Sequence, residues 1–222
     1  MSTADPLRNE ILALFAGAPA AVVSDALDRL GRRNQALDPS IRPLWPEARL
    51  VGFALPVVIA ANTSEPAHPY AGEMTALEAL RAGDVPMLAV EPGVLAASWG
   101  ELFSCAAIGA GSPGVVIDGL TRDASAIREL DFPTFARGLS PLDTFARAVV
   151  KEVGVETRVG GVDVSPGDLV VGDVDGVVVV PGDLVAEVAA AVGVKRRLEG
   201  NARADLLTGM GIRAVWERYG VF

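Results

Sequence analysis

The chain has 222 residues, of which half are hydrophobic and 21% are charged, an ordinary globular mixture with enough apolar material for a core. Its formal net charge of −9 argues against binding to nucleic acid or to an anionic membrane, because both need clustered Lys and Arg. Cys105 and His68 are the only residues of their types, which excludes an intramolecular disulfide and a zinc cage of several Cys and His ligands.

The first half of the chain alternates between helical and strand patterns. Residues 6–15 read as a helix, and residues 24–31 as a second helix that Ser24 or Asp25 caps and Gly31 ends. A strand is predicted over residues 49–61, an amphipathic helix over 75–83, and a buried strand over 85–93 that closes in a Pro92-Gly93 turn.

The same alternation continues in the second half. A helix is predicted over residues 100–111, a buried strand over 114–119, a helix over 123–131 with Asp123 at or next to its cap, and a short strand over 132–138. Residues 159–181 read as two or three strands, followed by a helical tail from about Leu184. No linker divides the chain, so residues 1–222 are expected to form one α/β domain.

Residues 11–27 could be mistaken for the apolar part of a secretory signal. Asp5 and Glu10 stand where a signal peptide needs positive charge, so a helix, a Gly-Pro turn and a second helix are expected instead. Apolar runs also fall short of the roughly 18 to 20 residues of a membrane span. A cytoplasmic protein with no membrane partner is therefore expected.

Two other features favour structural roles. His68 is expected to lie in a proline-flanked loop, although a catalytic Ser-His pair would have to depend on it. Asp173 and Asp175 in "GDVDG" are expected to be turn residues, because the segment lacks the spaced acidic ligands and distal Glu of a calcium loop.

The segment "WGELFSCAAIGAGSPGVVIDGLTRD" carries the chemistry that needs most explanation. If its two helices begin at the same edge of the sheet, Glu101, Arg122 and Asp123 share one pocket with two helix N-termini, whose N–H groups attract anions. Arg122 offers a planar cationic fork for a carboxylate or an enolate oxygen, and Asp123 an oxygen ligand for Mg²⁺ or Mn²⁺. Glu101 could orient water or relay a proton. These residue types fit a metal-dependent lyase acting on an α-keto acid.

A structural interpretation of the same residues stays open from their spacing alone. Asp123 could be only a helix cap, Arg122 its surface neighbour, and Glu101 a first-turn residue that complements the helix dipole.

At these residues the sequence resembles the 4-hydroxy-4-methyl-2-oxoglutarate / 4-carboxy-4-hydroxy-2-oxoadipate aldolases, which are grouped with the ribonuclease E regulator A (RraA) proteins. The likeness covers most of the chain, through "VVSDALDRLG", "WGEL", "GVVIDGLTRD", "FPTFARG" and "SPGDLVVGDVDGVVVVP". It implies a swivelling β/β/α-like fold elaborated into an α-β-β-α sandwich. It also implies homotrimers or hexamers with sites between subunits.

The resemblance also implies roles for particular residues. Arg122 would hold pyruvate, Asp123 would anchor a divalent cation, Mg²⁺ or Mn²⁺, and the backbone amides of Gly100, Glu101, Leu102 and Phe103 would receive the substrate carboxylate. Glu199 is the candidate for a glutamate that such aldolases take from an adjacent subunit. Some characterised aldolases have Asp where this chain has Glu101, which leaves the preferred substrate and the rate open.

The expected function is a class II aldolase that releases pyruvate from 4-hydroxy-2-oxo acids such as 4-hydroxy-4-methyl-2-oxoglutarate, with oxaloacetate decarboxylation as a second activity. The alternatives are another metal-dependent reaction on a related acid and a non-catalytic regulator that binds an RNA-processing enzyme. The chain retains the Arg122-Asp123 pair, from which the regulator branch tends to depart, and this favours the enzyme.

Overall fold

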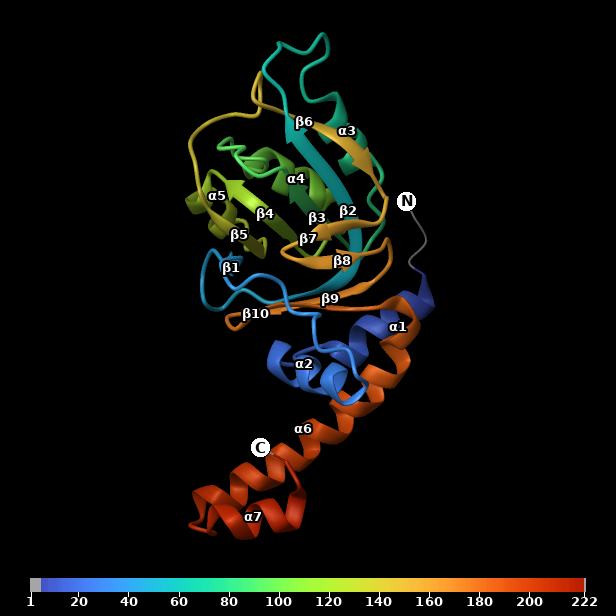
Figure 1. Cartoon of the computed structure of the whole chain (residues 1–222), viewed down its shortest axis with the longest axis vertical. Coiled ribbons are helices and arrows are strands. Elements are labelled where there is room, and N and C mark those ends of the chain that lie inside the picture. The colour runs from blue at the N-terminus through green and yellow to red at the C-terminus, as the bar shows by residue number, and fades with distance from the viewer. Residues whose placement is uncertain (1–4, 222) are drawn as a thin grey trace.

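The computed structural model describes residues 5–221 as helices, an eight-stranded mixed sheet and a separate two-stranded sheet (Figure 1). The helices are α1 Pro6–Phe15, α2 Ala20–Arg29, α3 Ala71–Glu78, α4 Glu101–Gly109, α5 Ala124–Glu129, α6 Val185–Leu207 and α7 Ile212–Tyr219, with a 3-10 turn, η1, at Gly182–Leu184. The strands are β1 Arg42–Pro43, β2 Leu50–Ala61, β3 Asp84–Val90, β4 Val115–Thr121, β5 Thr134–Leu139, β6 Ala148–Val153, β7 Thr157–Val159, β8 Val162–Val164, β9 Leu169–Asp173 and β10 Gly176–Val180.

The central strands run parallel and set the position of the pocket described below. The sheet has the order β1-β5-β4-β3-β2-β9-β10, in which β2, β3, β4 and β5 pair in parallel and the outer strands pair antiparallel. Because β3 and β4 are parallel neighbours, the segments that follow them leave from the same edge. α4 and α5 therefore both begin at this edge, as the strand-turn-helix order predicted.

Three apolar clusters separate the layers of the structure. One lies between α3, α4 and α5 and the parallel strands, and includes Trp99, Ile117 and Ile127. A second fills the space inside the curved sheet, where Phe135 and Met87 are fully buried. The third packs α1, α2 and α6 against β9 and β10. This sequence of helix, sheet, sheet and helix confirms the predicted α-β-β-α sandwich.

The two ends of the sheet come close to each other. Arg42 in β1 donates from Nη1 to the carbonyl oxygen of Asp175 at 3.0 Å, next to the start of β10, and Ala36 forms a β-bridge with Val178. The sheet is thereby nearly closed into a barrel. Three strands were not predicted, β1, β6 and β7. β1 has two residues, β6 reads as "AVVKEV" after a loop without a regular pattern, and β7 ends at residue 159, where the predicted strands begin.

The start of α2 differs from the prediction. The helix begins at Ala20, directly after Pro19, so Ser24 and Asp25 lie inside it and do not cap it. The carboxylate of Asp173, at the end of β9, accepts the N–H of Ala20 at 3.0 Å and the N–H of Asp175 at 2.9 Å. Asp175 is therefore a turn residue, as expected, whereas Asp173 is the last residue of β9 and satisfies a helix N-terminus from a distant part of the chain.

Replacing Asp173 by alanine is expected to lower the free energy of unfolding by about 1 to 2 kcal/mol, the usual cost of losing a helix cap. Asp173 is 4% exposed, so water replaces its oxygens poorly. Urea denaturation measures the change. Asp175→Ala removes an exposed carboxylate from the same turn and is the matched control. Equal stability of the two variants would contradict the capping role.

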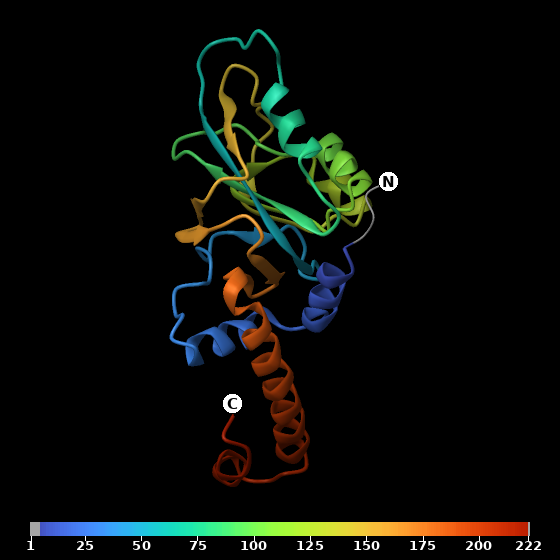
Figure 2. The same cartoon turned by 90° about the vertical axis from the view of Figure 1, so that its right-hand side faces the viewer.

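The tail leaves the body of the structure as the predicted helical segment. α6 packs its first turns on α1 and α2, and its far end carries α7 away from the sheet (Figures 1 and 2). Within residues 5–221 no single helix is long and apolar enough to cross a membrane, although α1 and α2 together pass that test with a bend of 99° between them.

Candidate functional site

Two chain segments lie side by side at the carboxyl ends of β3 and β4. The backbone N–H of Arg122 donates to the carbonyl oxygen of Trp99 at 3.0 Å, and the Thr121 hydroxyl donates to the same oxygen at 3.1 Å. Trp99 and Thr121 are both buried, so these bonds are shielded from water. They hold the start of α4 against the start of α5.

A pocket of about 440 Å³ opens where these segments meet. Its walls are formed by Tyr70, Ala97, Trp99, Gly100, Glu101, Leu102, Phe103, Arg122, Asp123, Asp143 and Thr144. Six of the seven residues singled out in the sequence thus line one cavity, and only Glu199 lies elsewhere. A second hollow, lined in part by Leu139 and Ser140, shares Arg122 and Asp123 with it.

The carboxylate of Asp123 contacts α4 and makes no capping bond in α5, the helix that it precedes. Asp123 occupies the N-cap position of α5 in a left-handed conformation, with φ 58° and ψ 32°, yet its side chain makes no capping bond there. Its Oδ2 accepts the N–H of Glu101 at 3.1 Å and lies 3.5 Å from Arg122 Nε. The left-handed conformation is uncommon for non-glycine residues, and Asp is among those that adopt it most readily. Asp123 thus stands at the predicted cap position of α5, but its carboxylate contacts α4 and Arg122 and does not cap α5.

The N-terminus of α4 keeps further donors for an anion. The N–H of Glu101 donates to the Asp123 carboxylate. The first intrahelical bond runs from the N–H of Ser104 to the carbonyl oxygen of Gly100. The N–H groups of Leu102 and Phe103 belong to the first turn, where an α-helix offers no carbonyl partner. Together with the positive end of the helix dipole they form an acceptor site for a carboxylate at the pocket wall.

Gly100 is required by the close approach of Asp123 and Arg122. A Cβ at this position would stand 2.6 Å from Asp123 Oδ2 and 3.2 Å from Arg122 Cγ. Its backbone is extended, so the constraint is space and not conformation. The substitution Gly100→Ala is expected to push the Asp123 carboxylate away and to lower kcat/KM for a reaction in this pocket by about 100-fold, as a displacement of about 1 Å can.

Gly109→Ala, in the same helix, is the matched control. A Cβ on Gly109 meets nothing within 4 Å, so this variant is expected to retain activity. Steady-state kinetics on both variants, with melting temperatures to check folding, make the comparison. Wild-type kinetics in the Gly100 variant would show that the tight contact has no role in the reaction.

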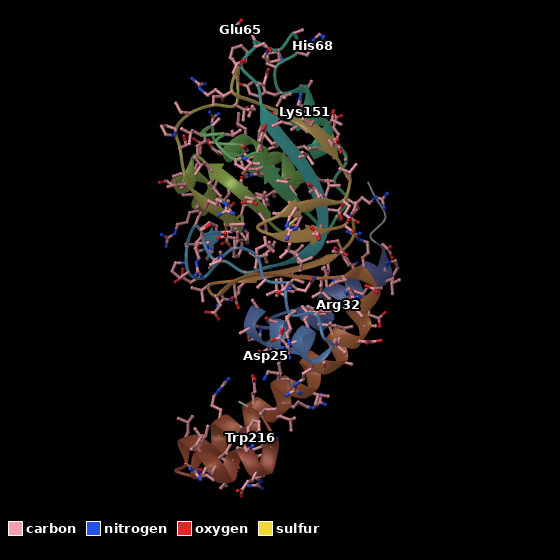
Figure 3. The ribbon with its side chains drawn as sticks, viewed as in Figure 1. Asp25, Arg32, Glu65, His68, Lys151 and Trp216 are labelled. Carbon is pink, nitrogen blue, oxygen red and sulfur yellow. The ribbon has the colours of Figure 1, made fainter. Side chains whose placement is uncertain are left out.

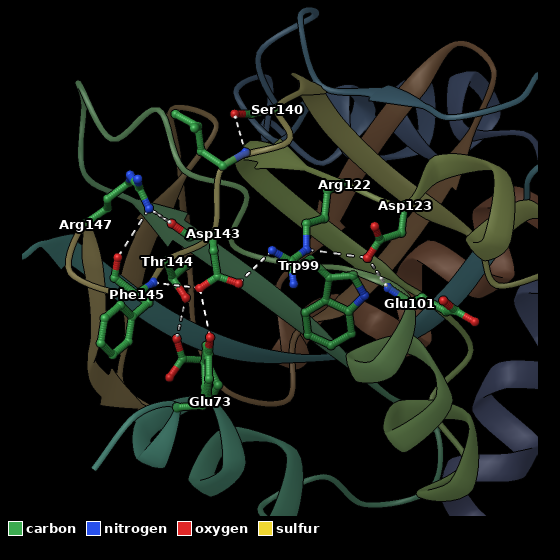
Figure 4. A network of polar contacts seen from close by, with 12 residues as sticks. Glu73, Trp99, Glu101, Arg122, Asp123, Ser140, Asp143, Thr144, Phe145 and Arg147 are labelled. Carbon is green, nitrogen blue, oxygen red and sulfur yellow. Dashed lines mark hydrogen bonds and ion pairs between the residues drawn. The ribbon is translucent and has the colours of Figure 1, made fainter. Parts of the chain in front are cut away.

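The guanidinium of Arg122 pairs with two carboxylates, those of Asp123 and Asp143. Its Nη1 donates to Asp143 Oδ2 at 2.6 Å, and Asp143 Oδ1 in turn accepts the Tyr70 hydroxyl at 3.0 Å and the N–H of Phe145 at 2.7 Å (Figure 4). Partial burial raises the pKa of Asp143, but the bonds from Phe145, Arg122 and Tyr70 outweigh burial and lower it. Asp143 is therefore an anion at neutral pH.

Asp143, Tyr70 and Thr144 were missed in the sequence. They come from two loops, 62–70 and 140–147, in which no regular pattern marks a site. The Tyr70–Asp143 bond joins the two loops, and the Thr144 hydroxyl, which donates to Glu73 at 3.3 Å, joins the second loop to the first turn of α3. His68 lies in the first of these loops, as expected, beyond the pocket at the tip of the structure (Figure 3).

Of the two glutamates that the sequence predicts for the site, only Glu101 lies at the pocket of its own chain. Glu101 lines the pocket, and its exposed side chain extends away from Arg122 (Figure 4). Glu199 lies on α6 and pairs with the buried Lys195 at 2.9 Å, while Lys195 also meets Asp25 at 3.0 Å. Within one chain Glu199 does not reach the pocket.

The donor set fits a cation that keeps most of its water. Residues 5–221 contain no group of three or more His, Cys, Asp or Glu arranged to hold a metal ion. Mg²⁺ commonly uses one or two carboxylates and fills its other positions with water and substrate oxygens. Asp123 has a half-exposed carboxylate whose two recorded contacts both use Oδ2, which leaves Oδ1 for such a ligand.

Comparisons with known proteins agree with this architecture. A protein of Halalkalibacterium halodurans named "Putative 4-hydroxy-4-methyl-2-oxoglutarate aldolase" is 30% identical over 167 residues, which cover 75% of this chain and 74% of that protein. An uncharacterised protein of Pseudomonas syringae has a solved structure with a TM-score of 0.85 at 27% identity, and the match covers 99% of this chain and 100% of that one. The long helical tail is thus included in a known structure.

A third relative belongs to the regulator group. RraAS2 of Streptomyces coelicolor, described as an unusual member of the RNase ES inhibitor RraA protein family, has a TM-score of 0.79 at 25% identity, covering 91% of this chain and 98% of that one. The sequence profile of the RraA-like family, described as Aldolase/RraA, matches residues 20–179. The chain therefore belongs to the RraA-like family, which includes both aldolases and RraA proteins.

Proposed function

We propose that this protein is a divalent-metal-dependent class II aldolase that releases pyruvate from 4-hydroxy-2-oxo acids such as 4-hydroxy-4-methyl-2-oxoglutarate. The observation that supports it most is the convergence of Arg122, Asp123 and the first turn of α4 in one pocket. The Halalkalibacterium halodurans relative supports the aldolase assignment by its name. Oxaloacetate decarboxylation is proposed as a second activity, because it passes through the same pyruvate enolate.

The pocket offers a partner for each part of such a substrate. The Leu102 and Phe103 N–H groups would bind the carboxylate, and Arg122 would donate to the 2-oxo oxygen as it gains negative charge. Asp123 would hold the cation, which when bound acts as a Lewis acid on the 2-oxo group. The C3–C4 bond then breaks as the 4-hydroxyl loses its proton, and C3 of pyruvate is protonated afterwards.

The proton acceptor is proposed to involve Glu101 and Glu199. Glu101 lines the pocket, but its carboxylate extends away from Arg122. It would therefore relay a proton through a water molecule. Glu199 would act from an adjacent copy in a homotrimer or hexamer, because α6 carries it away from the pocket of its own chain. In this assembly the sites lie between subunits.

The test is pyruvate release from 4-hydroxy-4-methyl-2-oxoglutarate and from oxaloacetate, with Mg²⁺ or Mn²⁺ and with a chelator. Metal-dependent release from both acids is the expected result. If the protein released pyruvate from neither acid, the proposal would be contradicted. Equal rates with and without chelator would contradict its metal dependence.

A second candidate is a regulator of an RNA-processing enzyme, favoured by the likeness to RraAS2. The acidic surface suits a basic partner protein. Binding of such a partner together with absence of keto-acid turnover would favour the regulator over the aldolase.

A further inference from the structure

The carboxylate of Asp143 links Arg122 to two residues of the surrounding loops. Its Oδ1 accepts two hydrogen bonds, from the Phe145 N–H and the Tyr70 hydroxyl, and its Oδ2 accepts from Arg122 Nη1. The Phe145 contact closes a turn two residues long, which fixes the carboxylate relative to its own backbone. The orientation of Oδ2 toward Arg122 is therefore set before any ligand enters.

Tyr70 extends this support to a second segment. It has a left-handed backbone, with φ 61°, directly before α3, a conformation that is uncommon for a bulky residue. Its hydroxyl bond to Asp143 raises the pKa of Tyr70, so the phenol remains a proton donor at neutral pH. The Thr144–Glu73 bond also ties the Asp143 loop to the first turn of α3, which directly follows Tyr70.

The consequence falls on the guanidinium of Arg122. Its side chain is 37% exposed, and an arginine with that much freedom would sample several rotamers without a partner. Asp123 near Nε and Asp143 at Nη1 fix two corners of the planar group, and the third nitrogen, Nη2, points away from both carboxylates (Figure 4). A fixed donor costs no reorganisation when charge develops on the substrate.

We propose that Asp143, braced by Tyr70, is a positioning residue that presents Arg122 to the enolate oxygen of the bound pyruvate unit. This inference rests on the proposed aldolase function and adds to it a role for two residues outside the Gly100–Phe103 and Arg122-Asp123 segments. Neither residue needs to touch the substrate for the reaction to depend on it.

The test combines turnover with a binding measurement that needs no turnover. Oxalate, a planar dianion that resembles the pyruvate enolate, is titrated by calorimetry in the presence of Mg²⁺. In Asp143→Asn the amide oxygen can still accept from Phe145 and Tyr70, but an amide nitrogen faces Arg122. We expect about 30-fold weaker oxalate binding and about 100-fold lower kcat/KM.

Two further variants separate positioning from folding. Tyr70→Phe keeps the Asp143 carboxylate but removes the hydroxyl that donates to it. A loss of about 3-fold in both oxalate affinity and kcat/KM is therefore expected. Asp143→Glu keeps the charge and should recover part of the loss. Asp163→Asn, which removes an exposed carboxylate on β8, is the control for charge alone and should leave both readouts unchanged.

The outcomes distinguish failure of the positioning role from failure of the aldolase proposal. If the wild-type protein binds oxalate and releases pyruvate, but Asp143→Asn does so equally well, the positioning role is wrong while the aldolase proposal stands. If Asp143→Asn lowers the melting temperature and the active fraction but leaves oxalate affinity unchanged, Asp143 is only a folding residue. If the wild-type protein neither binds oxalate nor releases pyruvate, both proposals fall.

Discussion

Replacing Arg122 by alanine is expected to lower kcat/KM for pyruvate release by about 1,000-fold, the upper range for removal of one donor to a developing oxyanion. Arg122 is the only cation among the residues that line the pocket within the described part of the chain, and it faces Asp123 and Asp143 there. Its loss would leave these carboxylates next to the negative charge that forms on the substrate. Initial rates with 4-hydroxy-4-methyl-2-oxoglutarate and with oxaloacetate measure the effect.

Two variants check that this loss comes from the guanidinium. Arg122→Lys keeps a positive charge but not the planar fork, so it should recover no more than about a tenth of the wild-type activity. Arg158→Ala removes an exposed arginine of β7 that pairs loosely with Asp163 and should behave as the wild type. Activity of Arg122→Ala within a few fold of the wild type would remove its assigned role.

Replacing Asp123 by asparagine is expected to raise the Mg²⁺ concentration needed for half-maximal activity by about 100-fold. The amide keeps the size of the side chain and an oxygen for the Glu101 N–H, so α4 should keep its contact while the charge that holds the cation is lost. Titration of activity with Mg²⁺ and with Mn²⁺ provides the two curves.

The control for this variant is Asp175→Asn, which removes an exposed carboxylate from the turn between β9 and β10. It should leave the metal titration unchanged. If Asp123→Asn and the wild type gave superimposable titrations, Asp123 would not be the ligand that anchors the cation.

The convergence at the pocket could be predicted from sequence because it follows from local patterns. In each of two parallel strands the next regular element along the chain is a helix, so Glu101, Arg122 and Asp123 were expected to reach the same edge of the sheet. The residue types then indicated the chemistry. Spacing alone left open whether Asp123 was a simple cap; the structure shows that its carboxylate accepts the N–H of Glu101 in α4 and makes no capping bond in α5, and its role as a metal ligand stays a prediction.

Other features depend on contacts between distant parts of the chain. Asp173 caps a helix that starts 153 residues earlier, so the local signals at Ser24 and Asp25 gave the wrong start for α2. Asp143 and Tyr70 lie 73 residues apart in loops of irregular sequence, and only the folded chain brings them to Arg122. The role of Glu199 stays a prediction, because it depends on a second copy of the chain.

The most direct measurement is a crystal structure of the protein with Mg²⁺ and pyruvate. The account predicts a cation held by Asp123, directly or through water, with the pyruvate carboxylate at the Leu102 and Phe103 N–H groups and its 2-oxo oxygen within hydrogen-bond distance of Arg122. Pyruvate bound at another place, or a pocket in which neither Arg122 nor the start of α4 contacts it, would contradict the account.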